Sequence, residues 1–376
     1  MKITDIKCYM VPFNKENPRY GWRKDCEYGD GMQPGKKTFT AYVKVETDEG
    51  IDGFTQCWDR ADILSDVIRR RYRRFIGRDP LMTEQIWQDL WQLDRAERLQ
   101  VDMPSYLDLA LWDIKSQAAD LPVYKMIGGN SSKVRAYAST VTWETPDEYE
   151  RHIKACMNVG FTAFKLHGYG VLKDDIRLAR SLRKWAGDDA ILMFDASAAF
   201  CLEEALTLGR ELEYCGYYWL EEPMREFNVP GYIRLCEHLT IPVLGAETNE
   251  GAHWAAATWI STGACDMIRT SSKRTGGITG AVKVAHLAES FGMKAQVLHE
   301  RGCVDLPLCA GLSNNDFFEQ IITDAEQIKT LHLNGEKRVV NGYVTAPERP
   351  GVDIHPDWNL IEKSAQYVVS AKDQNW

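Results

Sequence analysis

Three acidic residues stand out because each of them ends a short apolar run that has the pattern of a buried strand. Asp195 ends Ile-Leu-Met-Phe-Asp, Glu221 ends Tyr-Tyr-Trp-Leu-Glu, and Glu247 ends Pro-Val-Leu-Gly-Ala-Glu. The three positions, 195, 221 and 247, are 26 residues apart in each step, which is one strand and one helix. Carboxylates that converge in a cleft stay ionised only if a cation compensates them. All-oxygen ligands favour Mg²⁺, with Mn²⁺ as the alternative, over zinc. Three unrelated acids in solvated loops would not be expected to coincide with three strand ends.

Two further strand ends carry candidate bases. One apolar run ends Phe-Lys-Leu-His, and because side chains alternate along a strand, Lys165 and His167 face the same side. Another run ends Val-Leu-His-Glu and carries His299. In a closed barrel this strand would lie across from the strand that carries Lys165. A substrate held over the metal would have Lys165 on one face and His299 on the other. A lysine near cationic neighbours has a lowered pKa and can act as a base at neutral pH. For any one of these bases alone, a salt-bridged structural residue explains the pattern equally well.

The elements that would position these residues alternate regularly through the second part of the chain. Short apolar runs are each followed by an amphipathic helical pattern, one strand and helix unit at a time. The runs cover residues 134–141, 163–167, 191–195, 217–221, 242–247, 266–270, 294–299 and 316–320. Such a succession predicts a parallel (β/α)₈-type barrel, in which side chains at the C-terminal strand ends point into the active site.

The two ends of the chain have a different pattern. Strands are predicted at 3–11, 38–46 and 51–55, and a helical pattern follows from 62 to about 120. Residues 1–128 are therefore predicted to form an α+β domain and residues 129–328 the barrel. Residues 329–376 lose the barrel rhythm and are expected to pack back on the N-terminal domain.

Composition excludes some classes of function. The chain of 376 residues has a net charge of −9, which argues against a nucleic-acid binder because that function needs a basic face. No stretch approaches the ~20 consecutive apolar residues of a membrane span. The N-terminal residues have no signal-like apolar core, and the ten cysteines include no CxxC pair. We therefore expect a cytoplasmic protein with reduced thiols, without a membrane or nucleic-acid partner.

These residues resemble the site of the enolase superfamily. Asp195, the Glu-Glu-Pro run at 221–223 and Glu247 match its metal-ligand pattern, and the Lys165-x-His167 pair and His299 resemble its mandelate racemase subgroup. Similar stretches also occur at 110–115, 121–129, 276–280 and 346–351, so the resemblance covers essentially the whole chain. It implies a modified (β/α)₇β barrel of the TIM type, with an α+β N-terminal capping domain that the C-terminal segment completes. It also implies one Mg²⁺ per subunit, a homo-oligomer, and abstraction of the proton α to a carboxylate. By the same resemblance, Glu319 is an acid that hydrogen-bonds the substrate carboxylate.

The chain departs from the subgroup at three positions. His167 replaces the second lysine of a Lys-x-Lys pair, and Ser197 replaces an asparagine. The strand-six aspartate that usually pairs with the catalytic histidine is absent, and Ser271 or Thr270 stands in its place. Without a carboxylate partner, nothing would stabilise the His299 imidazolium or fix its tautomer. We therefore expect Lys165 to be the base and His299 the acid, with His167 as the second candidate for the acid.

The resemblance and these departures predict dehydration of a sugar acid, an aldonate or an aldarate. Lys165 would remove the α-proton, Mg²⁺ would stabilise the ene-diolate, and loss of the β-hydroxyl would give a 2-keto-3-deoxy acid. The polar, cationic loop at residues 20–24, together with Arg60 after the third predicted strand, suits a polyhydroxylated anion as substrate. A solvated run of charges has the same pattern. The predicted substrate-binding residues from this region are Trp22, Arg23, Lys24 and Arg60.

Two alternatives remain open. A racemase, epimerase or lactone cycloisomerase on the same scaffold would share the metal and the first proton transfer. A non-catalytic relative that only binds an acid would explain the missing strand-six aspartate and the replaced second lysine.

Overall fold

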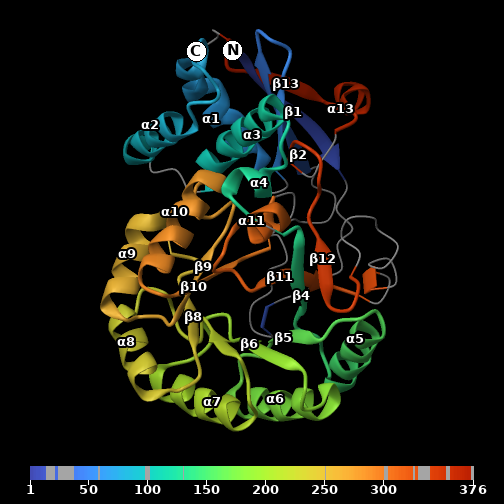
Figure 1. The fold of residues 1–376 in the computed structure, drawn as a ribbon, viewed down its shortest axis with the longest axis vertical. Coiled ribbons are helices and arrows are strands. Elements are labelled where there is room, and N and C mark those ends of the chain that lie inside the picture. The colour runs from blue at the N-terminus through green and yellow to red at the C-terminus, as the bar shows by residue number, and fades with distance from the viewer. Residues whose placement is uncertain are drawn as a thin grey trace.

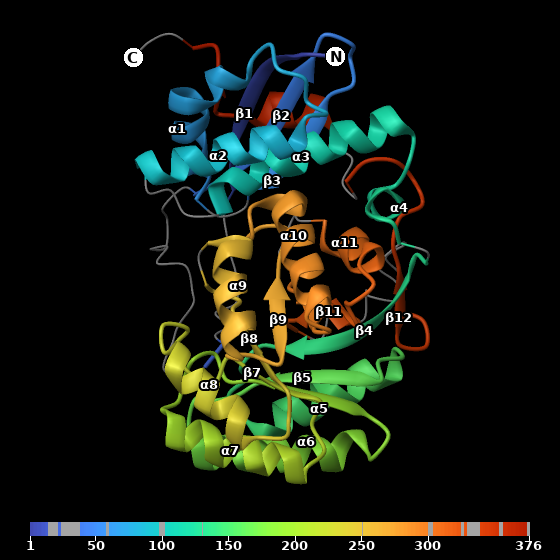
Figure 2. The same ribbon diagram turned by 60° about the vertical axis from the view of Figure 1, so that its left-hand side comes forward.

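The computed structural model describes residues 1–13, 22–23, 38–57, 60–97, 102–129, 131–249, 251–299, 304–324, 327–328, 339–352 and 356–373. These residues form two units, one above the other along the long axis of the molecule (Figures 1 and 2). The upper unit is an antiparallel sheet with helices, and the lower one is a barrel of parallel strands surrounded by helices.

The upper unit is built from both ends of the chain. Its sheet has the order β13 (Tyr367–Ser370), β1 (Ile3–Phe13), β2 (Thr38–Thr47) and β3 (Gly53–Cys57). The helices of this unit are α1 (Ala61–Arg71), η1 (Tyr72–Phe75), α2 (Thr83–Glu97), α3 (Asp102–Ala119), α4 (Val123–Ile127) and α13 (Trp358–Ser364). β13 pairs antiparallel with β1, with Val369 opposite Cys8. The C-terminal segment therefore completes the N-terminal domain, as the sequence predicts.

The core of the upper unit follows from the alternation in β1. Ile6, Cys8 and Met10 are fully buried on one side of this strand, which is the period of two that a half-buried strand requires. Helix α3 packs so closely on β3 that a Cβ atom at Gly53 would lie 2.1 Å from the Ala110 carbonyl oxygen. Only glycine fits at this contact between strand and helix.

The lower unit is a nearly closed barrel. Its strands are β4 (Lys133–Thr140), β5 (Ala163–His167), β6 (Ile191–Asp195), β7 (Trp219–Glu221), β8 (Val243–Gly245), β9 (Met267–Thr270), β10 (Lys294–Val297) and β11 (Phe317–Ile322). The helices between them are α5 (Pro146–Asn158), α6 (Leu172–Ala186), α7 (Leu202–Tyr214), α8 (Val229–His238), α9 (Ala252–Thr262), α10 (Gly277–Ser290) and α11 (Asp305–Gly311). The strands are hydrogen-bonded in the order β10-β9-β8-β7-β6-β5-β4-β11. This arrangement confirms the predicted fold class.

Two further contacts complete the barrel. The gap between β10 and β11, the two ends of this order, is bridged by hydrogen bonds from Ala295 N to the Asn314 carbonyl (3.0 Å) and from Val297 N to Asn315 Oδ1 (2.9 Å). Strand β12 (Tyr343–Thr345) pairs antiparallel with residues 133–135 at the start of β4, whereas β5 pairs with β4 further along, at Ala138 and Ser139. The C-terminal segment therefore contacts the barrel as well as the upper unit.

The predicted strands are all present, and β5, β6 and β7 end at the predicted residues, whereas β8 and β10 end two residues earlier than predicted. β7 and β8 have three residues each, and Glu247 lies two residues beyond the end of β8. His299 likewise lies two residues beyond β10. At β8 the reason is visible in the backbone, because Ala246 adopts a positive φ angle of 68°, which ends the extended conformation.

The upper unit covers the C-terminal ends of the barrel strands. The Thr279 hydroxyl, at the start of α10, donates to Asp108 Oδ1 (2.6 Å) and accepts from Trp112 Nε1 (2.9 Å). Trp87 Nε1 donates to the Gly276 carbonyl (2.7 Å). Gly277 has φ 92°, and a Cβ atom there would lie 2.2 Å from Asp108 Oδ2. The two units are therefore joined by buried hydrogen bonds next to the strand ends that carry the candidate site.

Within the part of the chain that the structure describes, none of the helices has the length and apolar character needed to cross a membrane. The cytoplasmic location and the homo-oligomeric state expected from the sequence stay predictions.

The buried Asp108 makes stability depend on pH. Burial raises its pKa from 3.8 to about 7, and hydrogen bonds from Thr279 only partly offset this effect. The folded state thus holds a proton that the unfolded state releases, so the stabilisation is complete below pH 3.8 and lost as the pH rises to about 7. We predict that Asp108→Asn weakens the fall in unfolding free energy between pH 5 and pH 8, measured by urea denaturation. Burial also raises the pKa of Asp113 to about 7. Because Asp113 is unchanged in this variant, part of the fall in unfolding free energy should persist. An unchanged pH dependence in Asp108→Asn would contradict this assignment.

Candidate active site

The three predicted metal ligands meet at the C-terminal ends of neighbouring strands. Asp195 is the last residue of β6, Glu221 is the last residue of β7, and Asp195 stands opposite Glu221 in the register of this pair. Glu247 follows β8, the next strand. One carboxylate oxygen from each residue lies within 4.8 Å of the other two. The convergence that the spacing predicts is therefore present in the structure.

The backbone turns sharply beside each of these carboxylates. Ser197 and Ala198 follow Asp195 with φ angles of 47° and 57°. Glu222, directly after Glu221, and Ala246, directly before Glu247, also have positive φ angles. Non-glycine residues in this region carry strain that persists only where the surrounding structure enforces it, and such strain is concentrated at functional sites.

Lys165 lies among the carboxylates. Its Nζ atom is 2.9 Å from Glu221 Oε2, 2.9 Å from Glu319 Oε1 and 3.3 Å from Asp195 Oδ2. Burial alone would lower the pKa of Lys165, but the charges of Glu221 and Glu319 outweigh it and hold the pKa well above its ordinary value. The expectation of a lowered Lys165 pKa is therefore wrong for this structure, because the groups that contact the amine are anions rather than cations.

His167 is held between two acceptors. Its Nε2 atom lies 3.0 Å from Asp195 Oδ2, and its Nδ1 atom contacts the Thr140 carbonyl. The Trp22 ring packs on the imidazole with a centroid distance of 4.4 Å. Because both ring nitrogens face acceptor atoms, His167 is arranged as a donor next to a candidate metal ligand.

Two arginines also contact the acidic cluster. Arg269, in the middle of β9, is fully buried, and its Nε atom lies 2.5 Å from Glu221 Oε1. Its Nη2 donates to the Tyr137 hydroxyl (3.0 Å) and lies 3.7 Å from Glu319 Oε2. Arg274 Nη1 lies 3.4 Å from Glu247 Oε1. Lys165 and Arg269 thus offset the charges of Glu221 and Glu319, and Arg269 also reaches Glu247, with 4.0 Å between Nε and Oε2.

The side of the cluster near Glu247 retains excess negative charge. Burial raises the pKa of Glu247, and although Arg274 opposes this rise, the charges of Glu221 and Asp195 help bring the value to about 7. Burial and the charges of Glu247, Asp195 and Glu221 raise the pKa of Glu222 well above its ordinary value. Glu222 Oε1 accepts a hydrogen bond from Glu247 N (2.7 Å), so this second glutamate fixes the backbone at a candidate ligand.

Glu319 lies within β11 and is buried beside Lys165. Besides its contact with Lys165, it accepts a hydrogen bond through Oε2 from the His299 backbone N (3.3 Å). Burial would raise its pKa, but Lys165 and Arg269 reverse this and hold the pKa far below the usual range. A carboxylate that stays ionised accepts hydrogen bonds and cannot donate one to a substrate carboxylate. That predicted role stays a prediction, and the structure favours Glu319 as a counter-ion of Lys165.

His299 has a carboxylate neighbour that the sequence did not indicate. Its Nδ1 atom lies 3.5 Å from Oδ2 of Asp305, the first residue of α11. Asp305 is fully buried and accepts a hydrogen bond on its other oxygen from the Ser272 hydroxyl (2.6 Å). The expectation that His299 lacks a carboxylate partner is therefore wrong, because an acid from a helix takes the position that strand six leaves empty.

The predicted substrate-binding residues of the N-terminal domain are found in different places. Trp22 reaches His167, and Arg23 Nη1 donates to the Ser197 carbonyl (3.1 Å), so both lie at the barrel mouth. Arg60 Nη1 lies 3.6 Å from Asp102 Oδ2, an ion pair within the N-terminal domain. Lys24 lies outside the described residues. The ligand roles of all four stay predictions.

The buried residues that organise the site were mostly missed by sequence reasoning. These are Tyr137, Arg269, Ser272 and Asp305. An arginine inside the apolar run at 266–270 was the one available signal, since a charged residue in a buried strand requires a partner.

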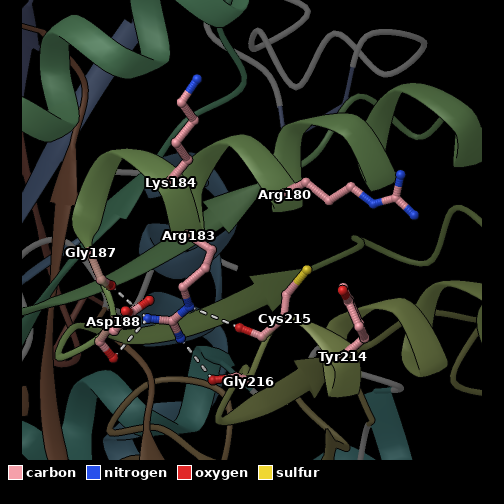
Figure 3. A pocket seen from close by; sticks show the side chains of 8 residues that line it. All are labelled: Arg180, Arg183, Lys184, Gly187, Asp188, Tyr214, Cys215 and Gly216. Atoms are coloured by element: carbon pink, nitrogen blue, oxygen red, sulfur yellow. Dashed lines mark hydrogen bonds between the residues drawn. The ribbon is translucent and has the colours of Figure 1, made fainter.

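A pocket of 750 Å³ lies on the other side of the barrel. It is lined by the C-terminal parts of α6 and α7 and by the loops that follow them (Figure 3). Asp195 and Glu221 stand at the other ends of the strands into which these loops lead. The Arg183 guanidinium lines this pocket and donates hydrogen bonds to backbone carbonyls, among them those of Cys215 and Gly187 (2.8 Å each) and Gly216 (2.9 Å). Arg183 therefore joins the loop before β6 to the loop before β7, and its N–H groups donate to backbone carbonyls of the protein itself.

The fold and the site together define a barrel protein whose polar centre is a group of carboxylates with a lysine and two histidines. Comparisons with known proteins agree. Residues 32–128 match the mandelate racemase/muconate lactonizing enzyme N-terminal domain, and residues 148–360 match the enolase C-terminal domain-like family. The chain belongs to this enolase-type family of mandelate racemase-like proteins and is an enzyme.

Its relatives include lyases and an isomerase. The chain is 28% identical to D-galactarolactone cycloisomerase of Agrobacterium fabrum, over 94% of this chain and 96% of that protein. It is 26% identical to arabinonate dehydratase of Saccharolobus solfataricus, over 93% and 95% of the two chains. A crystal structure of D-glucarate dehydratase from Agrobacterium tumefaciens, complexed with magnesium, is 30% identical with a TM-score of 0.84, covering 97% of this chain and 99% of that one.

Arg269 should be indispensable for stability. Its removal leaves Glu221 and Glu319 buried without one of their cations, which costs about 3–5 kcal/mol when one partner of a buried ion pair is lost. We predict that Arg269→Gln lowers the free energy of unfolding by this amount in chemical denaturation. Arg180→Gln is the matched control, because Arg180 pairs with Glu211 on the surface and its loss should leave stability nearly unchanged. Equal effects of the two substitutions would contradict the structural role of Arg269.

Proposed function

We propose that this chain is a Mg²⁺-dependent dehydratase of a sugar acid, an aldonate or aldarate. The observation that carries the proposal is the group of three carboxylates at the mouth of a barrel, with Lys165 in contact with two of them and His299 nearby. Both bases adjoin Glu319, through Lys165 Nζ (2.9 Å) and the His299 backbone N (3.3 Å). The names of the relatives, which include dehydratases of arabinonate and D-galactonate, support the substrate class.

The donor set fits magnesium. Asp195, Glu221 and Glu247 offer only oxygen, which is the ligand that a hard cation such as Mg²⁺ prefers. The excess negative charge around Glu247 and Glu222 is of the kind that a cation would compensate. A bound Mg²⁺ would hold the substrate carboxylate and stabilise the negative charge that spreads onto it when the α-proton leaves.

The residues of the chain then have distinct tasks. Lys165 takes the α-proton, which requires its neutral amine. Two of the three carboxylates that keep Lys165 charged are proposed metal ligands, so their charge would be shared and would act less on the amine. His299 donates a proton to the departing β-hydroxyl, which leaves as water, and the enol product becomes a 2-keto-3-deoxy acid. His167 is the second candidate for this acid. Trp22 and Arg23, which contact the barrel mouth, would bind the polyhydroxylated part of the substrate.

An isomerase is the second candidate function. The similarity to D-galactarolactone cycloisomerase favours it, as does the carboxylate beside His299, which allows this histidine to act as a base as well as an acid. Racemisation, epimerisation and cycloisomerisation would use the same metal and the same first proton transfer. A relative that only binds an acid would not need Lys165 beside the metal ligands.

The dehydratase is tested by product formation. With Mg²⁺ present, we predict that at least one member of a panel of aldonates and aldarates gives a 2-keto acid, detected as its semicarbazone. The panel includes the lactones and their epimers as a control for isomerisation. Absence of keto acid together with exchange of the α-proton in D₂O would exclude the dehydratase and support the isomerase.

The metal site is tested by three variants. We predict that Asp195→Asn, Glu221→Gln and Glu247→Gln each weaken Mg²⁺ binding at least about tenfold in titration calorimetry, since each removes one charge from a compact oxygen site. Glu211→Gln, which alters a partly buried acid of α7 that pairs with Arg180, is the control and should bind like the wild type. Wild-type affinity in any of the three variants would remove that residue from the metal site.

The two bases are separated by hydrogen exchange. We predict that Lys165→Ala abolishes exchange of the substrate α-proton in D₂O, followed by proton NMR, because it removes the base. His299→Asn should stop turnover but leave measurable exchange, because it removes the acid that acts afterwards. Lys184→Ala, on the opposite face of the barrel, is the control. Loss of exchange in His299→Asn with exchange retained in Lys165→Ala would reverse the two roles.

A further inference from the structure

His299 and Asp305 form a contact between two elements that follow one another in the chain. Asp305 begins α11, and its Oδ2 atom lies 3.5 Å from His299 Nδ1. The imidazole also packs edge-on against Phe318, with a centroid distance of 5.4 Å, which restricts its orientation. The ring therefore presents one nitrogen to the carboxylate, and its Nε2 atom necessarily lies on the opposite side of the ring.

Burial makes this carboxylate dependent on its donors. Asp305 is 1% exposed, and a carboxylate removed from water requires hydrogen bonds to both of its oxygens. The Ser272 hydroxyl satisfies Oδ1 at 2.6 Å. The second oxygen, Oδ2, lies 3.5 Å from His299 Nδ1, which is long for a hydrogen bond. Catalytic hydrogen bonds are often long in the free enzyme and shorten when the substrate binds.

The origin of the two partners explains the departure of this sequence from its family. Ser272 lies in the segment after β9, next to Ser271, where the subgroup usually carries the acid. Here this segment supplies a hydroxyl, and the acid that the hydroxyl holds comes from α11 instead. The carboxylate beside His299 is thus supplied by α11, and it is hydrogen-bonded to the segment after β9.

We propose that Asp305 is the positioning residue of His299. It accepts a hydrogen bond from Nδ1–H, which selects one tautomer and leaves Nε2 for the substrate, and it stabilises the imidazolium. The effect on catalysis rests on the proposed function, whereas the prediction that His299 carries its proton on Nδ1 does not. Among the described residues, the ionisable groups nearby include Glu319, which accepts from the His299 backbone, Arg269, which donates to the Val297 carbonyl (3.3 Å), and Cys309 on α11.

The tautomer can be measured without any substrate. The Mg²⁺-loaded protein, labelled with ¹⁵N-histidine, is studied by long-range proton–nitrogen NMR at pH 8, and the His299 signals are assigned by their loss in His299→Gln. We expect the wild type to carry its proton on Nδ1 and the preference for Nδ1 to weaken in Asp305→Asn. A proton on Nε2 in the wild type would overturn the proposal, and this result does not depend on whether Asp305→Asn folds.

Kinetics test the same contact in turnover. Asp305→Asn should lower kcat at least about tenfold with KM changed less than about threefold, as expected for a residue that orients a catalytic group. Ser272→Ala, which only loosens Asp305, should show a smaller loss of the same kind. Asp316→Asn is the control, because Asp316 binds Lys294 and Gln296 and has no contact with His299. An unchanged kcat in folded Asp305→Asn would overturn the proposal.

The two arms separate this proposal from the proposed function. If no sugar acid is converted, the proposed function fails, and the NMR measurement alone decides whether Asp305 orients His299. If acids are converted but His299 carries its proton on Nε2, the proposed function stands and the role of Asp305 is excluded.

Discussion

Mutual repulsion among buried carboxylates is the constraint on which the rest of this structure depends. Asp195, Glu221, Glu247 and Glu319 converge at the mouth of the barrel, and such a group is stable only if positive charge is placed among its members. Lys165 and Arg269 provide this charge from β5 and β9, on either side of the acidic strands. Glu247 stands at the edge of their reach, where a further cation would be accommodated.

The fold meets this constraint by geometry. Parallel strands bring their C-terminal ends to one face, so residues far apart in the sequence become neighbours without long loops. The sharp turns after β6 and β7 and before Glu247 aim the carboxylates at one another. The upper unit then covers this face and is fixed to α10 by Asp108 and Thr279. Trp22 and Arg23 connect the two units directly at the site.

Sequence reasoning was successful where it depended on periodicity. Strand and helix repeats located the barrel, and the position of Asp195 and Glu221 at strand ends located the carboxylate cluster, because both follow from local pattern. It failed where three-dimensional contacts decide. The neighbours of Lys165 are anions rather than cations, so its pKa rises. Asp305 becomes the partner of His299 only because α11 packs beside β10 and the Ser272 segment, and no spacing rule relates these residues.

The central claim is that the three carboxylates bind a divalent cation which also binds the substrate between Lys165 and His299. The most direct test is an anomalous difference map from crystals grown with Mn²⁺ and a sugar acid that the enzyme converts. The account predicts one peak in contact with Asp195, Glu221 and Glu247, and an α-carbon that lies between Lys165 Nζ and the His299 ring. A peak elsewhere, or a sugar acid bound away from both bases, would contradict it.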